Sequence, residues 1–257
     1  MDELATSLSG LVIGNIGERD EFSFKKELFE KRMDNSYCIA LFGEKAQKGI
    51  ELVTSTGRPY QVLYEIPKKA SSSSKCDLSI LFKNTQETLH LSIKSKRGSN
   101  PSLLNHTTRS ANVFQHGPLK DDLIYLDLLA KEYHDKRTKG TISEDVKLST
   151  LESYATDHIK QSIFNLLIYF IFIGTGRQAS TPSCNSIMML NKDNTKTFIS
   201  CITQQEKEVY VTSLIDHCIL SFRHKGMRKR ISEQDMPWVG HYQNKNYGAI
   251  HIRLSLK

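Results

Sequence analysis

Three residues in the first half of the chain have types and a spacing that could do chemistry: Asp77, Ser92 and Lys94. A carboxylate can bind a divalent cation, because magnesium prefers oxygen ligands and keeps several of its waters. A lysine beside it can orient or deprotonate a water and stabilise negative charge. Hydrolysis of a phosphodiester has these requirements, since it needs a cation, an attacking water and relief of the charge that develops on the phosphate.

Two strand-like segments are expected to bring these residues together. They run from Cys76 to Phe82 and from Thr88 to Ser95, and the polar turn Lys83–Gln86 joins them as a β-hairpin. Asp77 begins the first segment and Lys94 lies near the end of the second, so antiparallel pairing makes them neighbours. Alternation along the second segment puts Lys94 on the same face as the residue two positions before it. The sequence therefore predicts a carboxylate and an ammonium at the mouth of a hairpin.

Segment 74–95 resembles the PD-(D/E)xK nuclease superfamily. The run Ser74-Lys75-Cys76-Asp77-Leu78-Ser79-Ile80 is similar to the Ser-Lys-x-Asp-apolar entry of many restriction endonucleases, and Leu91-Ser92-Ile93-Lys94 is similar to their second-strand half-motif. Two departures stand out. Ser92 replaces the expected Glu or Asp, and no proline precedes Asp77. A serine is a weaker metal ligand than a carboxylate, although the superfamily tolerates Asn, Gln or Ser at this position.

The resemblance implies a fold, a reaction and a set of residue roles. The fold is α/β (α+β), with a mixed central β-sheet flanked by helices, restriction-endonuclease-like. The reaction is Mg²⁺-dependent hydrolysis of double-stranded DNA at a short specific sequence, by a type II restriction endonuclease of the bacterial cytoplasm. Asp77 would bind the metal together with the backbone carbonyl of Ile93 and a glutamate from the first helix. Lys94 would position the attacking water, and Ser92 would steady a water at the metal.

A further carboxylate is needed because the serine carries no charge. A helix predicted over Asp20–Asn35 offers Glu27 and Glu30, and a strand predicted over 62–66 offers Glu65. The run Lys26-Glu27-Leu28-Phe29-Glu30 resembles the first helix of several restriction enzymes, in which a glutamate packs against the metal site. Glu30 is favoured because it follows an apolar residue at the edge of the expected buried stripe. An ordinary ion pair with a lysine one turn away explains either helical glutamate equally well.

The charge balance favours an anionic partner. The formal net charge is +7 and the pI is about 9.0, and neutralisation of phosphates by Lys and Arg drives binding to nucleic acid. Basic and polar loop residues are the expected contacts to double-stranded DNA, although such runs are most often solvated faces. These residues are Lys96, Arg97, Arg109, Arg177, Gln178, Arg223, Lys225, Arg228, Lys229, Arg230 and His241.

The whole chain, 1–257, is predicted to form one restriction-endonuclease-like domain, in which 178–257 could be a C-terminal DNA-recognition subdomain. The longest apolar stretch, 163–173, is too short to cross a bilayer, so no membrane is implied. Five scattered cysteines without a secretory signal favour reduced thiols in a cytoplasm. No obligatory protein partner is evident. Further helices are expected over 119–135, 157–173 and Val211–Phe222, and strands over Ser186–Leu190, Thr197–Ile202 and Tyr247–Leu254.

Two other functions are compatible with the same residues. A repair or nicking nuclease of the same superfamily would use this centre to cut one strand or a damaged site. A basic DNA-binding module would carry Asp77 and Lys94 as ordinary residues on the solvent face of an exposed hairpin. A zinc or histidine-nucleophile enzyme is disfavoured, because the histidines show neither HxH nor HExxH spacing.

Overall fold

The computed structural model describes residues 16–255, apart from 72–73, 99, 107–117, 144, 177, 225–240 and 243–244. Residues 106, 138, 222–224, 241–242 and 245–250 are described by their backbone alone. The chain divides into two compact units that interleave along the sequence. Unit 1 comprises Met1–Ala70, Asp77–Ser99 and Ile187–Ile199, and unit 2 comprises Ser71–Cys76, Asn100–Ser186 and Ser200–Lys257. Segment 178–257 is therefore shared between the two units.

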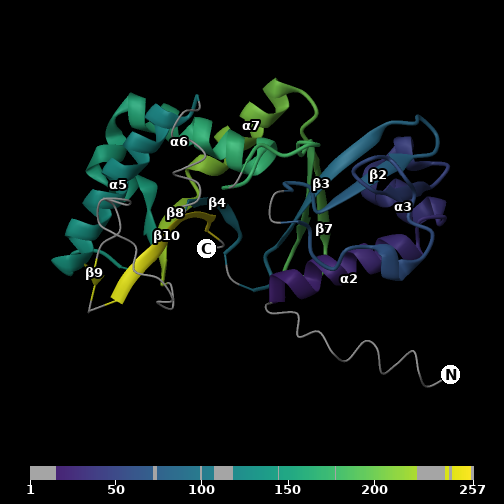
Figure 1. Cartoon of the computed structure of the whole chain (residues 1–257), viewed down its shortest axis with the longest axis horizontal. Helices are drawn as coiled ribbons and strands as arrows, with labels where there is room; N and C mark the ends of the chain where they lie inside the picture. Colours follow the sequence, from purple (N-terminus) through teal and green to yellow (C-terminus); the bar gives the residue numbers. More distant parts are fainter. Residues whose placement is uncertain are drawn as a thin grey trace, which may run out of the picture. The chain divides into compact units, whose positions relative to one another are not determined.

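Unit 1 is built on a mixed five-stranded sheet with the strand order β1-β2-β3-β6-β7 (Figure 1). Two helices, α2 (Ile16–Glu30) and α3 (Asn35–Phe42), pack on one face of this sheet. The sequence predicts a mixed α/β architecture, and the mixture of helices and strands, with a mixed sheet, is confirmed. The strands are β1 (Ile50–Val53), β2 (Leu78–Phe82), β3 (Thr88–Ser95), β6 (Ser186–Leu190) and β7 (Lys196–Ser200).

Strand alternation creates the core of unit 1. In β2 and β3, every second residue is apolar and points toward the helices, as a period of two residues requires. Side chains of α2 and α3 fill the space above this apolar face. The core residues of the two hairpin strands are Leu78, Ile80, Phe82, Leu89, Leu91 and Ile93, all less than 9% exposed.

Helix α2 buries a different stripe from the one that the sequence predicts. The helical spacing of the apolar residues in the sequence predicts a stripe of Phe22, Phe29 and Met33, with Phe24 and Leu28 beside it. The buried residues are Phe24, Lys25, Leu28 and Phe29. Met33 is 59% exposed because α2 ends at Glu30 and does not continue to residue 35. A second helix, α3, begins there, and the carboxylate of its N-cap residue accepts a hydrogen bond from a backbone N–H of the first turn.

The predicted hairpin is confirmed. Strands β2 and β3 pair antiparallel, with Leu78 opposite Leu91 and Ile80 opposite Leu89, and β3 covers the predicted residues 88–95. The second predicted pair, β6 and β7, is also adjacent in the sheet. Its turn is closed by a hydrogen bond of 2.9 Å from Asn191 N to Thr195 O.

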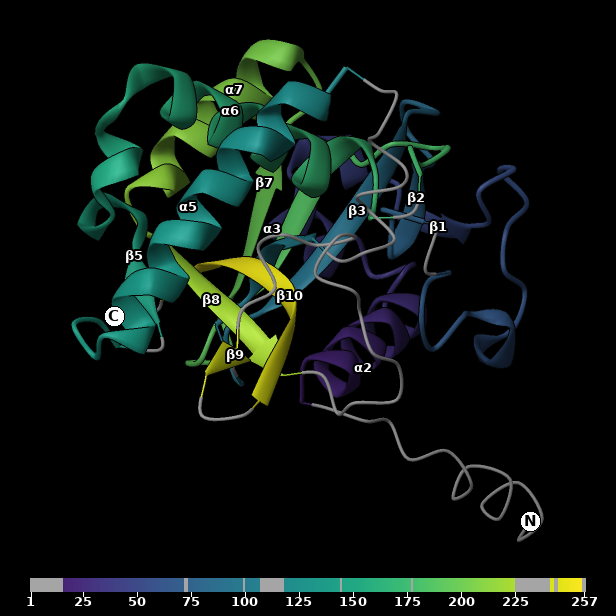
Figure 2. The ribbon, with the colours of Figure 1, turned by 60° about the vertical axis from the view of Figure 1, so that its left-hand side comes forward.

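Unit 2 contains a four-stranded antiparallel sheet of order β4-β10-β8-β5 and three helices, which gather beside its strands in Figure 2. Helix α6 continues directly into a short π-helix, Tyr169–Ile173. The helices are α5 (Lys120–Thr138), α6 (Asp157–Ile168) and α7 (Gln204–Ile215). The strands are β4 (Ser102–His106), β5 (Val146–Lys147), β8 (Cys218–His224) and β10 (Lys245–Leu254), and the short strand β9 (His241–Tyr242) pairs with β10.

The strand predicted over 62–66 is wrong. Leu63–Glu65 forms a 3-10 turn instead. The alternating residues Val62 and Tyr64 are 36% and 88% exposed, so they do not line a common buried face, which a strand of this pattern would need.

The helix predicted over Val211–Phe222 is wrong in its second half. Helix α7 ends at Ile215, and residues from Cys218 onward form β8, in which Cys218 pairs with Leu254 of β10. Long-range strand pairing overrides the helical pattern here, because it satisfies the backbone groups that a helix would otherwise satisfy locally.

In the described part of the chain, no helix is both long and apolar enough to span a membrane. All five cysteines are buried, and none of them forms a disulfide.

Candidate active site

Asp77 lies at the hairpin mouth, where the start of β2 meets the end of β3. Its backbone N–H donates to Leu91 O over 2.9 Å, which continues the β2–β3 ladder by one residue. Its carboxylate accepts two hydrogen bonds on the same oxygen, Oδ2: one from the backbone N–H of Ile93 at 2.7 Å and one from Ser92 Oγ at 3.3 Å. Neither bond uses Oδ1. The structure thus brings Asp77, Ser92 and the backbone of Ile93 together, as the hairpin prediction required.

Lys94 belongs to the same group of charges. It follows Ile93 in β3 and shares the strand face of Ser92, since the side chains alternate. The pKa of Glu21 in α2 is raised, first by burial and then by the negative charge of Asp77, and the positive charge of Lys94 is the smallest of the effects that oppose this rise. Lys94 and Asp77 therefore both act electrostatically on one further side chain.

That side chain, Glu21 of α2, was missed by the sequence analysis. Burial raises the pKa of Glu21 above its ordinary value, and Asp77 raises it further. Lys25 and Lys94 oppose these effects, and Lys25 Nζ lies 2.6 Å from Glu21 Oε1. A signal was present in the sequence: Glu21, Lys25 and Leu28 recur at helical spacing on one side of α2.

Glu30, the favoured third carboxylate, is not the α2 glutamate that responds to Asp77 and Lys94. Its side chain is 56% exposed and lies 3.8 Å from Lys26 Nζ, an ion pair between residues four apart on the helix surface. Helix phase explains the difference. Glu30 is nine residues after Glu21, which is two and a half turns, so the two side chains point in opposite directions.

The other two glutamates considered also have different partners. Glu27 forms an ion pair of 2.7 Å with Lys196; burial acts to raise the pKa of Glu27, but this lysine lowers it and the net direction is downward. Glu65 accepts a hydrogen bond of 2.9 Å from the backbone N–H of Gln61.

The donor atoms around Asp77 fit a magnesium ion. Among the described residues no group of three or more His, Cys, Asp and Glu side chains forms a ready-made metal cage. Magnesium does not require one, because it is usually held by one or two carboxylates and keeps several waters. Asp77 and Glu21 supply two carboxylates, and the backbone of Ile93 lies beside the first of them. These are hard oxygen donors of the kind that Mg²⁺ prefers.

A histidine lies on the same strand face, two residues before Ser92. His90 Nδ1 is 3.0 Å from Ser79 Oγ, its cross-strand partner. Burial lowers the pKa of His90 below its ordinary value of 6.5, which disfavours a positive charge on this histidine.

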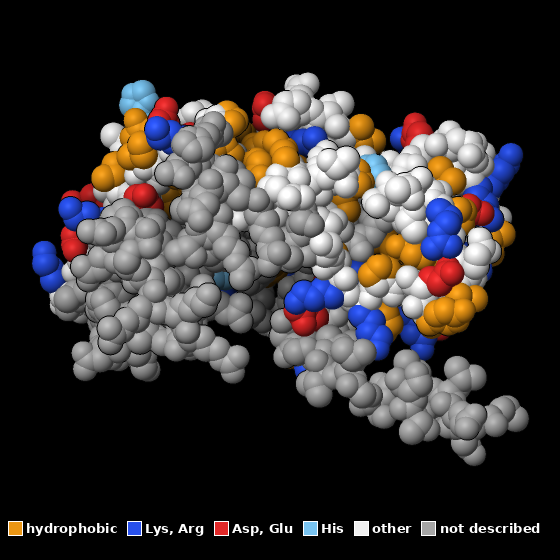
Figure 3. All heavy atoms as spheres, in the orientation of Figure 1, with side chains coloured by type: hydrophobic (Ala, Val, Ile, Leu, Met, Phe, Trp, Pro, Cys, Tyr) orange, Lys and Arg blue, Asp and Glu red, His pale blue; other side chains and the backbone are white. Residues whose placement is uncertain are grey.

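Three of the expected DNA contacts can be described in full. Arg97 is engaged within unit 1, because Nη1 lies 3.5 Å from Asp20 Oδ1 and Nε donates to Asn191 O over 3.1 Å. The backbone N–H of Lys96 donates to Leu190 O over 2.8 Å. Gln178 is exposed, and its carbonyl accepts from the backbone N–H of the third residue before it. On the face seen in Figure 3, described Lys and Arg side chains lie interspersed with Asp and Glu.

The remaining expected contacts cannot be placed by side chain. Arg223 lies in β8 and His241 in β9, and both are described by their backbone alone. Six others lie outside the described residues: Arg109, Arg177, Lys225, Arg228, Lys229 and Arg230.

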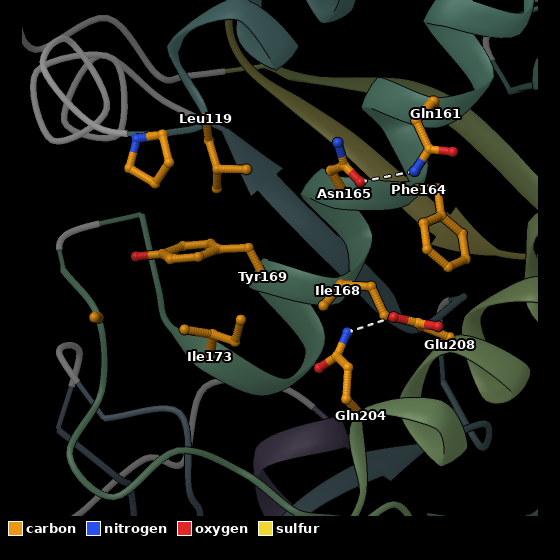
Figure 4. Close-up of a pocket in the computed structure, with 11 residues that line it drawn as sticks. Leu119, Gln161, Phe164, Asn165, Ile168, Tyr169, Ile173, Gln204 and Glu208 are labelled. Atoms are coloured by element: carbon orange, nitrogen blue, oxygen red, sulfur yellow. Dashed lines mark hydrogen bonds between the residues drawn. The ribbon is translucent and has the colours of Figure 1, made fainter.

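A cavity of about 620 Å³ lies elsewhere, within unit 2, between α6, the π-helix and α7 (Figure 4). Its walls are mainly apolar, and Gln161 Nε2 donates to Asn165 Oδ1 over 2.9 Å at one side of it. Its described lining holds one carboxylate, Glu208, and no Lys or Arg. The cavity therefore lacks the paired charges that phosphodiester chemistry requires, and the hairpin mouth is the stronger candidate for an active site.

No protein-family model, curated protein or solved structure matches this chain.

Proposed function

We propose that the protein is a Mg²⁺-dependent endonuclease of the type II restriction class, which cuts both strands of duplex DNA at a short specific sequence. The observation that carries this proposal is the charged cluster at the hairpin mouth. Asp77 accepts two hydrogen bonds from the β3 segment that leads to Lys94. Asp20, the residue before Glu21, accepts a hydrogen bond from Ser95, the residue after Lys94, so α2 brings Glu21 to the same end of β3. Two carboxylates can hold a divalent cation, and an ammonium can stabilise the negative charge that develops on the phosphate, so this cluster can support metal-assisted hydrolysis of a phosphodiester.

Each residue of the cluster has a distinct role in this proposal. Asp77 and Glu21 hold the cation, which when bound supplies Lewis acidity toward the phosphate. Lys94 orients the attacking water and stabilises the negative charge that develops on the phosphate oxygens. Ser92 and the N–H of Ile93 fix the Asp77 carboxylate through Oδ2, which leaves Oδ1 for the cation.

Duplex DNA as the substrate is supported by the charge of the chain and by the resemblance of segment 74–95 to restriction enzymes. A net charge of +7 favours a polyanion, because neutralised phosphates release their counterions. Sequence specificity would depend on base-edge contacts from Arg, Lys, Asn and Gln, for which the loops expected to reach DNA are the candidates.

Incubation of the purified protein with phage DNA and Mg²⁺, followed by sequencing of the fragment ends, tests the proposal. We expect a discrete band pattern with one shared end sequence, which disappears when the divalent ion is chelated. Intact DNA, or a smear without a common end sequence, would contradict the proposal of a restriction enzyme.

A supercoiled plasmid distinguishes the two rival functions. A nuclease that cuts one strand converts the plasmid to nicked circles, whereas cleavage of both strands at one site gives a linear product. A non-catalytic DNA-binding module retards the plasmid without any Mg²⁺-dependent change in its topology.

A further inference from the structure

Lys25 of α2 is fully buried, with 0% of its side chain exposed. Lysine is among the residues that are almost never fully buried unless paired, because removal of an ammonium from water is costly. Two oxygens compensate for this loss. Glu21 Oε1 lies 2.6 Å from Lys25 Nζ, and the carbonyl of Pro67 lies 3.4 Å away. Both contacts are within unit 1.

The ion pair with Lys25 makes the two oxygens of the Glu21 carboxylate inequivalent. Lys25 contacts Oε1, so Oε2 is the oxygen that can face another partner. The residue before Glu21, Asp20, accepts a hydrogen bond from Ser95 Oγ at the end of β3, and the backbone N–H of Ile93 in the same strand donates to Asp77. Oε1 of Glu21 is therefore held by a lysine of the same helix. The other carboxylate oxygen, Oε2, can face the charged residues at the hairpin mouth.

A surface ion pair would not fix a side chain in this way. Lys26 and Glu30 in the same helix are also four residues apart, but their atoms are separated by 3.8 Å and both side chains are about half exposed. Exposed pairs of this kind contribute little, because water competes for both charges. Lys25 has no such competition, since its ammonium is enclosed.

We propose that Lys25 is a positioning residue, whose buried ammonium holds Glu21 through Oε1 so that Oε2 is presented to the divalent cation shared with Asp77. This inference rests on the proposed function and adds to it a residue that touches neither the cation nor DNA. Partners that orient metal ligands commonly change metal affinity by about 10–100-fold when they are removed.

Titration calorimetry of Mg²⁺ into the DNA-free protein tests this role without any turnover. Lys25→Met keeps most of the aliphatic stem and removes the ammonium; we expect its Mg²⁺ affinity to fall at least about tenfold. Lys25→Gln keeps one N–H donor and should recover part of that loss. Lys26→Met is the matched control on the exposed side of α2, and its Mg²⁺ affinity should equal that of the wild type.

A double-mutant comparison separates positioning from a general structural effect. In a Glu21→Gln background the carboxylate is already absent, so the addition of Lys25→Met should leave the remaining Mg²⁺ affinity unchanged. This double variant also avoids an unpaired buried charge, the main reason why Lys25→Met could fail to fold. If Lys25→Met fails to fold, the test is the Mg²⁺ affinity of Lys25→Gln compared with that of the wild type. We expect Lys25→Gln to bind Mg²⁺ more weakly than the wild type.

Two results would overturn the inference. Unchanged Mg²⁺ affinity in a folded Lys25→Met protein would mean that Glu21 needs no positioning, and tighter binding would mean that Lys25 competes with the cation. The proposed function is tested separately in the same titration by Asp77→Asn, which should abolish binding. If the wild type binds Mg²⁺ and Asp77→Asn does not, a negative result for Lys25 leaves the proposed metal site intact. A wild-type protein that binds no Mg²⁺ contradicts both.

Discussion

The charges at the hairpin mouth balance one another. Asp77 and Glu21 contribute two negative charges, and Lys25 and Lys94 contribute two positive ones. Ser92 is only 1% exposed, so an ionised glutamate in its place would add a third, buried negative charge, which is costly in the absence of the cation. The departure of Ser92 from the Glu or Asp of the nuclease pattern is therefore consistent with Glu21 supplying the second carboxylate from the helix.

At the residue scale, the account predicts opposite outcomes for two glutamates of α2. Glu21→Gln should lower the cleavage rate at low Mg²⁺ by at least about tenfold, because loss of a proposed ligand should cost no less than loss of a residue that orients one. Glu30→Gln should cleave like the wild type, since Glu30 forms only an exposed ion pair with Lys26. Cleavage rates measured over a series of Mg²⁺ concentrations check both. Equal losses in the two variants would contradict the assignment of Glu21.

At the scale of elements, the local sequence pattern predicted the hairpin strands correctly, but it did not predict which face of α2 is buried. Strand alternation with a polar turn predicted β2 and β3 correctly, because the period of two residues is imposed by the backbone itself. The phase of α2 depends on which of its faces meets the sheet, and several apolar residues offer competing stripes. Lys25 conceals the true stripe, because a lysine at a core position reads as a surface residue.

The N-terminal half of α2 is attached to the end of β3. Asp20 Oδ2 accepts a hydrogen bond from Ser95 Oγ at 2.5 Å, and Asp20 Oδ1 lies 3.5 Å from Arg97 Nη1. Since Asp20 precedes Glu21 and Ser95 follows Lys94, this contact fixes the two elements that carry the site.

We therefore expect Asp20→Ala to lower the free energy of unfolding by about 1–3 kcal/mol, as for other hydrogen bonds to charged groups, and to lower the cleavage rate as well. Asp34→Ala is the control: it removes the N-cap of α3, which should cost about 1 kcal/mol without affecting cleavage. Urea unfolding and cleavage assays on both variants measure this. If Asp20→Ala cleaves at the wild-type rate despite lower stability, the contact does not position the site.

Helix α5 contains a partly buried carboxyl, Asp127, that should make stability depend on pH. Burial raises the pKa of Asp127 to about 7 from 3.8, and within the described structure its Oδ1 has no hydrogen-bond partner. As pH rises from about 4 to 7, the unfolded chain loses this proton while the folded chain keeps it, so Asp127 progressively lowers stability. Above about 7 both states are ionised and the penalty is constant.

Asp127→Asn removes this titration. Its stability relative to the wild type should increase between pH 4 and pH 7, by at most about 4 kcal/mol for a shift of this size, and by less where water screens the carboxylate. Thermal unfolding of the two proteins at pH 4.5 and pH 8 measures the difference. The same difference in Tm at both pH values would show that Asp127 titrates normally in the folded protein.

At the scale of the whole molecule, the excess of basic residues predicts how DNA is bound rather than how it is cut. With a net charge of +7, phosphate contacts should dominate affinity for a duplex. If six to ten phosphates are neutralised, affinity should fall about 10³–10⁵-fold between about 50 and 200 mM salt. Fluorescence anisotropy of a labelled duplex without divalent ions measures this slope. A loss of less than about tenfold would argue against DNA as the partner.

The division of the chain could not have been predicted from its composition. Segment Ile187–Ile199 belongs to unit 1 although it lies more than 80 residues after the hairpin. Its strand β6 joins the sheet beside β3, and such long-range pairing leaves no mark in local sequence pattern.

The most direct test of the central claim is the effect of Lys94→Ala on DNA binding and on Mg²⁺-dependent cleavage, measured on the same plasmid. We predict that binding is nearly retained while the cleavage rate falls at least about 10²-fold, because Lys94 acts on charge that develops during hydrolysis. Lys45→Ala, at an exposed ion pair with Glu87, should cleave normally. A Lys94→Ala protein that cleaves like the wild type, or a wild type that binds the plasmid and never cuts it, would contradict the account.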